Sequence, residues 1–276
     1  MKDLAGRVAL ITGAASGIGR ATAEALDAEG CRLILVDIDA AGLESLTATC
    51  QDVIASEVVD VGDAAAMQAL GERVHAQVPA LDILVNNAGI GMVGTLWETP
   101  LEGWERVLRV NLYGVLHGCH VFVPAMVARR AGQVVNVSST LGFFGAGGVN
   151  AYVTSKFGVL GLSESLRAEL APHGVGVSTI CPGVIDTAIV DQGTVYRGGA
   201  EDPALQGKLS KGFKKRAYPA SQVAAAIVRA IRKDQAVVPV SWEARALYWT
   251  KRWSPRLAAW LGGRLERNLG LEADER

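Results

Sequence analysis

Short apolar runs alternate with longer amphipathic segments along most of the chain. Seven runs are short and rich in β-branched residues, as buried strands are: Val8–Ile11, Leu33–Val36, residues around Glu57–Val59, Ile83–Val85, Val134–Val137, Val177–Ile180 and Val237–Val240. Five longer segments have the helical period: Gly17–Ala28, Ala64–Val78, Leu101–Arg130, Asn150–Ala171 and Ser221–Lys233. Strands buried on both faces are apolar throughout, so this order predicts an α/β fold with a doubly wound parallel sheet.

Two segments depart from this alternation. Residues 191–219 are polar and glycine-rich with several lysines, and we expect a solvated lid there rather than an anion-binding site. Residues 241–276 hold four of the six tryptophans, and Ser254-Pro255 is a typical helix start. We therefore expect one catalytic domain over residues 1–240, including the lid, and a helical extension over residues 241–276.

Composition narrows the function classes. Half of the 276 residues are hydrophobic, which excludes a disordered protein, and 27 Lys and Arg against 28 Asp and Glu leave no basic field for nucleic acid. The four cysteines form no CxxC pair, and the N-terminal apolar run is too short for a secretory signal. With no run of about 18 apolar residues, we expect no spanning helix, a cytoplasmic location and a small-molecule partner.

A glycine-rich turn follows the first predicted strand. In Thr12-Gly13-Ala14-Ala15-Ser16-Gly17-Ile18-Gly19, missing Cβ atoms let the backbone approach a pyrophosphate, and the N-terminus of the next helix favours negative charge. The spacing is GxxxGxG rather than the general GxGxxG, so an ordinary tight turn is an alternative. Asp37 ends the second strand, where a carboxylate can bind the adenosine ribose diol, and this favours a nucleotide site.

The same aspartate bears on the choice of cofactor. The charge of Asp37 would repel a 2′-phosphate, and neither Ser16 nor Ile38 supplies a compensating cation, so NAD is favoured over NADP. Arg20 and Arg32 are near in sequence and could offset that charge. Alternatively, Asp37 could cap the helix that follows it.

A second group of residues, in the second half of the chain, has the side chains that proton transfer requires. Tyr152 and Lys156 are four residues apart in a predicted helix, hence on one face, and Ser139 stands just beyond a strand, at the sheet edge where ligands bind. Using a phenol as a base at neutral pH requires lowering its pKa by about 3 units, or about 4 kcal/mol, and a nearby ammonium and a cationic nicotinamide act in that direction. Alone, Ser139 could equally be a cap or turn residue.

Together these residues resemble the short-chain dehydrogenase/reductase family, which binds NAD(P) on an extended Rossmann fold. The resemblance covers residues 5 to about 240 and rests on ordered motifs: Thr12 to Gly19, Asn86-Asn87-Ala88-Gly89, Asn111, Ser139, Tyr152 with Lys156, and Pro182-Gly183. It implies that Tyr152 is the acid/base, Ser139 orients the reacting oxygen, and Lys156 lowers the pKa of Tyr152 and holds the nicotinamide ribose. It also implies that Asn111 supports a water-linked proton relay.

The resemblance further implies a set of cofactor contacts. Asp60 and Val61 would flank the adenine, Asn87 the adenosine half, and Ile185 with Thr187 the carboxamide. The full expected set is Gly13, Ser16, Gly17, Ile18, Gly19, Asp37, Asp60, Val61, Asn87, Ala88, Gly89, Tyr152, Lys156, Pro182, Gly183, Ile185 and Thr187. A structural turn at residues 86–89 and a buried, satisfied asparagine at position 111 are the alternatives.

The expected function is NAD-dependent interconversion of a secondary alcohol and a ketone. Leu141, Phe143 and Phe144 after the serine, with the long lid, favour a sizeable apolar substrate. The alternatives are an NADP-preferring carbonyl reductase, an epimerase or dehydratase of the extended branch, and a non-catalytic nucleotide sensor. The resemblance also implies a homodimer or homotetramer joined through helices around residues 101–130 and 150–171.

Two remaining features have simple interpretations. His117, Cys119 and His120 lack a further ligand at suitable spacing, so we expect no metal site. In the extension, apolar residues fall on one helical face: Leu257, Trp260, Leu261 and Leu265. Six Lys and Arg against two Glu give residues 241–270 a charge of +4. Attachment to a membrane surface is possible, but packing over the substrate cleft or on a neighbouring subunit is preferred.

Overall fold

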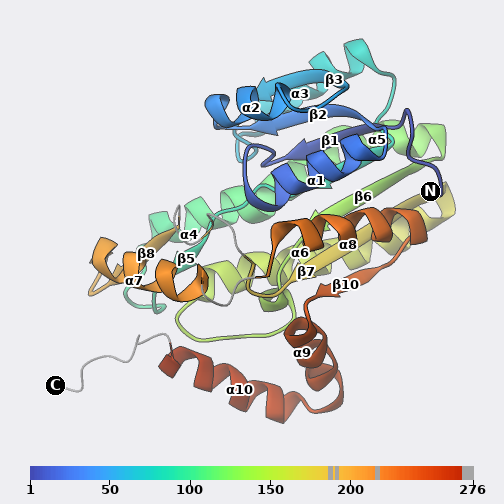
Figure 1. Cartoon of the computed structure of the whole chain (residues 1–276). Coiled ribbons are helices and arrows are strands. Elements are labelled where there is room, and N and C mark those ends of the chain that lie inside the picture. The colour runs from blue at the N-terminus through green and yellow to red at the C-terminus, as the bar shows by residue number, and fades with distance from the viewer. Residues whose placement is uncertain (186–188, 190–192, 215–217, 269–276) are drawn as a thin grey trace.

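A seven-stranded parallel sheet forms the centre of the molecule. The computed structural model describes residues 1–185, 189, 193–214 and 218–268. In the sheet the strand order is β10-β7-β6-β4-β1-β2-β3, and every pairing is parallel (Figure 1). The strands are β1 (Val8–Thr12), β2 (Arg32–Asp37), β3 (Val53–Val58), β4 (Ile83–Asn86), β6 (Gly132–Val137), β7 (Val175–Pro182) and β10 (Val237–Val240).

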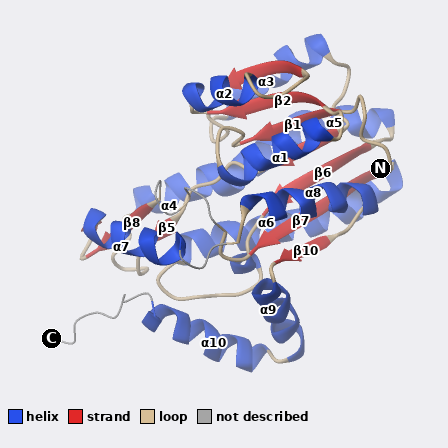
Figure 2. Ribbon diagram, in the orientation of Figure 1, coloured by secondary structure: helices blue, strands red, loops and turns tan. Residues whose placement is uncertain are grey.

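Helices cover both faces of this sheet (Figure 2). Those on one face are α1 (Gly17–Ala28), α2 (Ala40–Thr47) and α8 (Ala220–Lys233), and those on the other include α3 (Ala64–Gln77), α5 (Gly114–Arg129) and α6 (Asn150–Leu170). Alternate strand residues supply the two cores: Ala9 and Ile11 pack on the first side, Val8 and Leu10 on the second. Because both faces of β1 are covered, Val8 to Ile11 are all apolar, as the sequence pattern predicts.

The chain changes direction in the sheet between β1 and β4. From β1 it runs outward through β2 and β3, then returns to place β4 on the other side of β1, with Ala9 opposite Ile83 and Ile11 opposite Val85. Ligands in open α/β sheets bind at the carboxyl ends of strands at such a point. The turns that leave β1 and β4 are the glycine-rich turn and residues 87–89.

The predicted doubly wound sheet is confirmed, and α1 spans the predicted residues. The predicted helix over Leu101–Arg130 is α4 (Leu101–Leu108) followed by a π-helical turn, η1 (Arg109–Tyr113), and α5. The sequence analysis missed α2 and the small sheet of β5 (Met92–Val93), β8 (Thr194–Arg197) and β9 (Ala200–Glu201). Strands of two to four residues are too short to show a period.

The helix from Leu101 to Arg129 has a second notable property. It has 29 residues, and an 18-residue window within it has a mean hydropathy of 1.3, so it meets the length and composition of a membrane span, which the sequence analysis did not expect. Phe122 and Met126 on this helix are fully buried against the sheet. Its apolar surface thus forms part of the second core.

Most of the remaining elements follow the carboxyl ends of strands: the 3₁₀ turn η2 (Thr140–Gly142), α7 (Pro203–Lys214), α9 (Trp242–Trp253) and α10 (Pro255–Asn268). A second 3₁₀ turn, η3 (Ala171–His173), lies between α6 and the start of β7, at the opposite edge. The part of the expected lid that the structure describes contains β8, β9 and α7. The predicted helix start at Ser254-Pro255 agrees with α10, which begins at Pro255.

Candidate active site

The turn between β1 and α1 can be built only with glycine at two of its positions. A Cβ atom on Gly19 would lie 1.9 Å from the carbonyl oxygen of Gly13, and one on Gly13, whose φ is +67°, would lie 2.8 Å from Cα of Ala88. Ser16 caps α1 without a side-chain hydrogen bond to the helix. Ser16 therefore leaves the first-turn N–H groups without a side-chain cap, and such groups at a helix N-terminus suit a phosphate.

Asp37 ties the end of β2 to this turn. Its carboxylate accepts hydrogen bonds from the backbone N–H of Ala15 at 2.8 Å, of Ile38 at 2.7 Å and of Asp39 at 3.1 Å. The cap of α2 is Asp39, whose side chain accepts from Gly42 N, so the helix-cap interpretation of Asp37 is wrong. A carboxylate offers about four acceptor positions, so Asp37 has capacity left for a ribose hydroxyl.

The two arginines that could offset Asp37 have other partners. Arg20 lies 3.2 Å from Glu24 and also donates to Ser45. Arg32 lies 3.5 Å from Asp52 and begins β2, at the far end from Asp37. Neither contact directs a cation toward Asp37.

Asn87 holds the glycine-rich turn in place. Its Nδ2 donates to the carbonyl oxygens of Thr12 at 3.0 Å and Gly13 at 3.2 Å. The Thr12 hydroxyl in turn accepts from the backbone N–H of Asn87 at 3.0 Å and of Ala88 at 3.2 Å. Residues 86–89 therefore do form the structural turn that was the alternative to cofactor binding. The Asn87 side chain makes these bonds through Nδ2, so its Oδ1 atom can accept a hydrogen bond from another partner.

Ser139, Tyr152 and Lys156 lie together beyond the end of β6. Ser139 follows the strand and caps η2 by accepting from Leu141 N at 3.1 Å, and its side chain also shares a hydrogen bond with Tyr152. Lys156 lies one turn further along α6, with Nζ 5.7 Å from the centroid of the Tyr152 ring. The turn role of Ser139 and its contact with Tyr152 are thus both real.

Burial sets the protonation of this group. It raises the pKa of Tyr152 to about 12, against which the Ser139 hydrogen bond acts, and it lowers the pKa of Lys156 to about 8. The Lys156 ammonium donates to the carbonyl oxygen of Val137 at 3.0 Å rather than to the phenol. In the protein without a cofactor, desolvation is therefore the largest effect on the pKa of Tyr152, and the role of Lys156 together with a cationic nicotinamide in lowering that pKa stays a prediction.

Asn111 joins this group to the turn after β4. Its Oδ1 accepts from the backbone N–H of Ile90 at 2.8 Å, and its Nδ2 donates to Ile90 O at 3.0 Å and to Ser155 Oγ at 3.2 Å. Asn111 is fully buried in the π-helical turn η1, a distortion that is frequent at functional sites. A Cβ on Gly89 would lie 3.2 Å from Asn111 Oδ1 and 3.4 Å from Lys156 Nζ, so glycine gives these side chains room.

The residues after β3 are engaged with the helix that contains η1. Asp60 lies 2.7 Å from Arg109 and accepts from Gly62 N. Partial burial raises the pKa of Asp60, but the hydrogen bonds from Arg109 and Gly62 together lower that pKa by more, so the net shift is downward. Val61 is buried, and its carbonyl oxygen lies 2.9 Å from His117 Nδ1. Among the described residues no group of three or more His, Cys, Asp or Glu could hold a metal.

The turn after β7 closes the other side of the site. The carbonyl oxygen of Pro182 accepts from Thr140 Oγ1 at 3.0 Å, which joins this turn to the one that carries Ser139. Gly183 follows directly, and Ile185 packs in the first core and pairs with Tyr218. Thr187, expected to contact the carboxamide, lies outside the described residues.

The phenylalanines after Ser139 do not line the site. Phe143 and Phe144 are buried in a separate cluster with Ala258 and Leu247 of the C-terminal helices. The C-terminal extension packs on these two side chains, so they do not support the prediction of an apolar substrate. This contact joins the extension to the segment after Ser139, and packing over the substrate cleft or on a neighbouring subunit stays a prediction.

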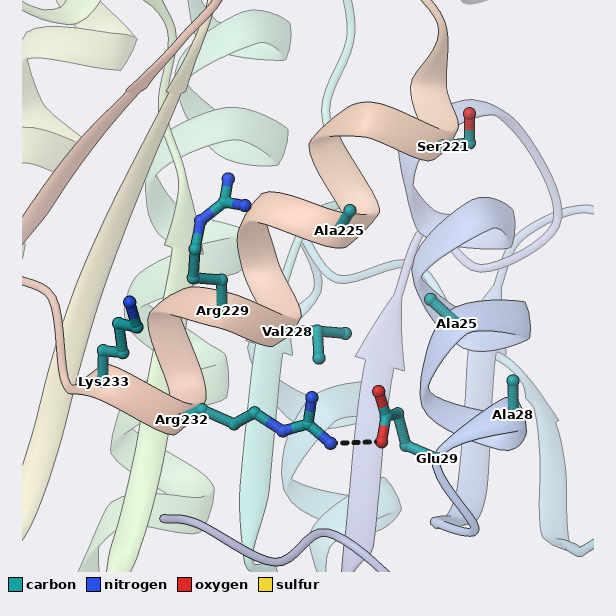
Figure 3. Close-up of a pocket in the computed structure, with 9 residues that line it drawn as sticks. All are labelled: Ala25, Ala28, Glu29, Ser221, Ala225, Val228, Arg229, Arg232 and Lys233. Atoms are coloured by element: carbon teal, nitrogen blue, oxygen red, sulfur yellow. Dashed lines mark hydrogen bonds and ion pairs between the residues drawn. The ribbon is translucent and has the colours of Figure 1, made fainter.

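A surface groove of about 550 Å³ lies elsewhere, between α1 and α8 (Figure 3). Its walls include Ala25 and Val228, and Arg232 forms an ion pair with Glu29 across it. None of the expected site residues lines it. The candidate site is therefore the carboxyl edge of the sheet.

Comparison with known proteins gives the family of this chain. A family model described as short chain dehydrogenase matches residues 7–194. The chain belongs to the short-chain dehydrogenase family. The predicted resemblance is thereby confirmed, and this family consists of NAD(P)-dependent oxidoreductases.

Individual relatives are also named as oxidoreductases or dehydrogenases. "Probable oxidoreductase EphD" of Mycobacterium tuberculosis is 43% identical over 253 residues, which are 89% of this chain but only 43% of EphD. "Putative oxidoreductase SadH" of the same organism is 35% identical over 90% of both chains. A short-chain dehydrogenase/reductase from Burkholderia phymatum, solved in complex with NAD, has a TM-score of 0.83 at 31% identity and covers 93% of this chain and 96% of that one.

Sequence reasoning missed several residues that organise this dehydrogenase site. The Thr12 hydroxyl accepts from the backbone N–H groups of Asn87 and Ala88. The Ser155 hydroxyl accepts from Asn111 and donates to the carbonyl oxygen of Tyr152, and Arg109 forms an ion pair with Asp60. A polar residue in an otherwise apolar strand was the available signal for Thr12. For the other two, no local pattern marks the distant partner, because the contacts of Ser155 with Asn111 and of Arg109 with Asp60 join segments more than 40 residues apart.

We expect Lys156→Met to alter how stability depends on pH. A lysine in the unfolded chain has its ordinary pKa near 10.5, whereas in the folded protein that pKa is about 8. Between these values the unfolded chain binds a proton that the folded protein has released, so the wild-type free energy of unfolding should rise with pH relative to that of the variant.

The measurement is urea unfolding of both proteins from about pH 7.5 to about pH 9.5, inside that window. Lys233→Met, at an exposed lysine at the end of α8, is the matched control and should show no comparable trend. A wild-type minus K156M difference that is flat or falls with pH would show that the ammonium is not desolvated in the folded protein.

Proposed function

We propose that this chain is an NAD-dependent oxidoreductase that interconverts a secondary alcohol and a ketone. The observation that carries the proposal is the cluster of Ser139, Tyr152 and Lys156 at the carboxyl edge of the sheet, beside a turn that only glycine can form. A proton-transferring phenol next to a dinucleotide cradle is the arrangement that hydride transfer to and from a carbonyl carbon requires.

The cofactor would lie along the carboxyl ends of β1, β2 and β4. Gly13 and Gly19 permit the tight turn before α1, where the helix N-terminus at Gly17 would bind the pyrophosphate, and Asp37 offers acceptors for the adenosine ribose. When bound, a nicotinamide supplies the acceptor or donor of a hydride. Lys156, next to Gly89, would hold the nicotinamide ribose, and Ser16, Ile18, Asp60, Val61, Asn87, Ala88, Pro182, Gly183, Ile185 and Thr187 complete the proposed contact set.

Tyr152 moves the proton. In the protein alone its phenol is protonated at neutral pH, which suits donation to a developing alkoxide in ketone reduction. In alcohol oxidation the phenol must lose its proton first, so additional positive charge beside it, from the oxidised cofactor together with protonated Lys156, must offset the cost of burial. Ser139 hydrogen-bonds the substrate oxygen, and Asn111 holds the segment through which a proton can reach Lys156.

The charge at Asp37 supports NAD as the cofactor. A 2′-phosphate on the adenosine ribose would approach a carboxylate, while Arg20 and Arg32 are occupied by Glu24 and Asp52. NADP preference, as in a carbonyl reductase of the same family, is the alternative. It would require Arg20 to leave Glu24.

An apolar substrate of some size is favoured by surfaces other than those expected from sequence. Gly94 pairs with Val149, three residues before Tyr152. Leu96 and Trp97 follow this bridge and are 60% and 76% exposed, and Val184, beyond Gly183, is 45% exposed. Apolar side chains are thus accessible on segments bonded to both sides of the proposed reacting centre.

The outer faces of the helical layer support a homo-oligomer. Tyr113 and Leu116 on the helix through η1 and α5, and Phe157 on α6, are between 39% and 50% exposed. The two helices contact each other at η1, so these apolar side chains occur on adjacent elements. We propose a dimer or tetramer in which this surface meets its copy.

Tyr152→Phe should abolish most turnover while leaving cofactor binding in place. Loss of the proton donor is expected to reduce kcat by a factor of about 10² to 10⁴, with the Kd for NAD changed little. The assay follows NADH at its absorbance maximum across alcohols and ketones graded by size and polarity. Tyr113→Phe, at an exposed tyrosine of η1, should retain wild-type activity, and full turnover in Y152F would overturn the proposed role of the phenol.

Asp37→Ala should shift cofactor preference toward NADP. Removing the carboxylate eliminates its repulsion of a 2′-phosphate and its bonds to the ribose, so the ratio of NAD to NADP affinities should fall by about tenfold, or about 1.4 kcal/mol. Fluorescence titration with both cofactors measures the ratio. Asp52→Ala removes an exposed aspartate near the opposite end of β2 and should leave the ratio unchanged. An unaltered ratio in D37A would show that Asp37 does not bind the adenosine ribose.

A double variant, Leu116→Glu with Phe157→Glu, should dissociate the oligomer. Each glutamate would be forced into an apolar contact against its own copy, where like charges repel. Analytical ultracentrifugation of wild type and variant gives the masses. Val58→Glu, at an exposed valine of β3, is the control, and a wild type that already sediments as a monomer would contradict the proposed interface.

A further inference from the structure

Over the described residues, one face of the C-terminal helices packs on the domain. Ring centroids of Phe143 and Tyr248 lie 5.2 Å apart in an edge-on contact, and Ala258 of α10 is 2% exposed in the same cluster. A Cβ on Gly262 would lie 2.3 Å from the carbonyl oxygen of Gly145, so α10 lies directly against that backbone. Figure 1 shows both helices outside the two layers that cover the sheet.

The opposite face of α9 carries tryptophans. Trp242, Trp249 and Trp253 are 72%, 57% and 82% exposed. Trp249 and Trp253 follow Trp242 by seven and eleven positions, which is about two and three helical turns, so the three side chains lie in one stripe. Ala244, buried in the same helix, is about 160° away from this stripe at about 100° per residue. Three large apolar side chains therefore point away from the domain.

The described part of α10 continues this character. Leu257 is 47% exposed and Trp260 is 52% exposed, while Ala258 and Gly262 face the domain. A helix at the surface of a globular domain ordinarily presents its apolar stripe to the core and its polar side to water. Here both helices have apolar residues on the outside as well.

Positive charge surrounds this aromatic surface. Of the described side chains over residues 242–263, four are cations and one is an anion: Arg245, Lys251, Arg252 and Arg256 against Glu243, all exposed. Arg245 and Arg252 fall on one flank of the tryptophan stripe, and the Arg252 guanidinium lies 4.6 Å over the Tyr248 ring. The net charge of the whole protein is −1, so the excess of cations is local.

We propose that the outer face of α9 and α10 docks on an anionic lipid bilayer. Tryptophan combines an apolar body with a polar N–H and is enriched where hydrocarbon meets headgroups, and arginine and lysine attract anionic headgroups. The chemistry of the patch therefore matches both layers of such a surface. A second copy of the chain fits less well, because a two-fold contact would bring the same cations together.

The test is sedimentation of the full-length protein with vesicles. Wild type should bind vesicles of phosphatidylglycerol and phosphatidylcholine, bind pure phosphatidylcholine at least about tenfold more weakly, and dissociate as salt is raised. Trp249→Ala with Trp253→Ala, and separately Arg245→Gln with Arg252→Gln, should each weaken binding to the anionic vesicles by about tenfold or more.

Matched controls address general surface effects. Trp97→Ala removes an exposed tryptophan far along the chain from the extension, and Arg229→Gln with Lys233→Gln removes two exposed cations of α8. Both should bind as wild type does. All variants should retain the wild-type thermal unfolding temperature, because none of the changed side chains is buried.

The outcomes are distinct from those that test the enzymatic proposal. Equal binding of W249A/W253A and wild type, or no binding of wild type to anionic vesicles at low salt, would overturn the proposal. So would a fall in oligomer mass for W249A/W253A in the absence of lipid, which would assign the face to a second copy. None of these measurements depends on turnover, so they stand whether or not an alcohol substrate is found.

Discussion

The ammonium group of Lys156 is buried where β6, α6 and the turn after β4 meet, and the arrangement of the site depends on how that charge is accommodated. Nζ donates to Val137 O at 3.0 Å, and Gly89 leaves it room because it has no side chain. The hydrogen bond aligns the end of β6, from which Ser139 extends, with the first turns of α6, on which Tyr152 lies. Desolvation lowers the pKa of the ammonium to about 8, so the protein keeps a cation there at a cost in stability.

A network of short hydrogen bonds extends this constraint to the cofactor side. Asn111 connects α6 to Ile90, and Asn87 connects the same turn to Thr12 and Gly13 of the first strand. The cluster of Ser139, Tyr152 and Lys156 and the glycine-rich turn are therefore joined by one set of buried and partly buried polar contacts. Such a network fixes distances between groups that come from distant parts of the chain, which is what catalysis by positioning requires.

The C-terminal helices add a surface that the domain does not need for its core. Their inner face packs on Phe143 and Phe144, close in sequence to Ser139, while their outer face has exposed tryptophans and arginines. The sequence analysis weighed a membrane surface against packing over the cleft as if one excluded the other. In three dimensions one face of these helices packs on the domain and the other is left for the proposed membrane contact, because Ala244 and the tryptophan stripe lie on opposite sides of α9.

The sequence by itself determined the alternation of strands and helices, the glycine-rich turn, Ser139 at a strand end, and Tyr152 with Lys156 on one helical face, because each of these depends on local periodicity or on neighbouring residues. The tertiary structure decided which partner each polar group has. Asp39 rather than Asp37 caps α2, Phe143 packs on the extension, and burial raises the pKa of Tyr152. Desolvation and long-range hydrogen bonds arise from segments that are distant along the chain, so no local pattern contains them.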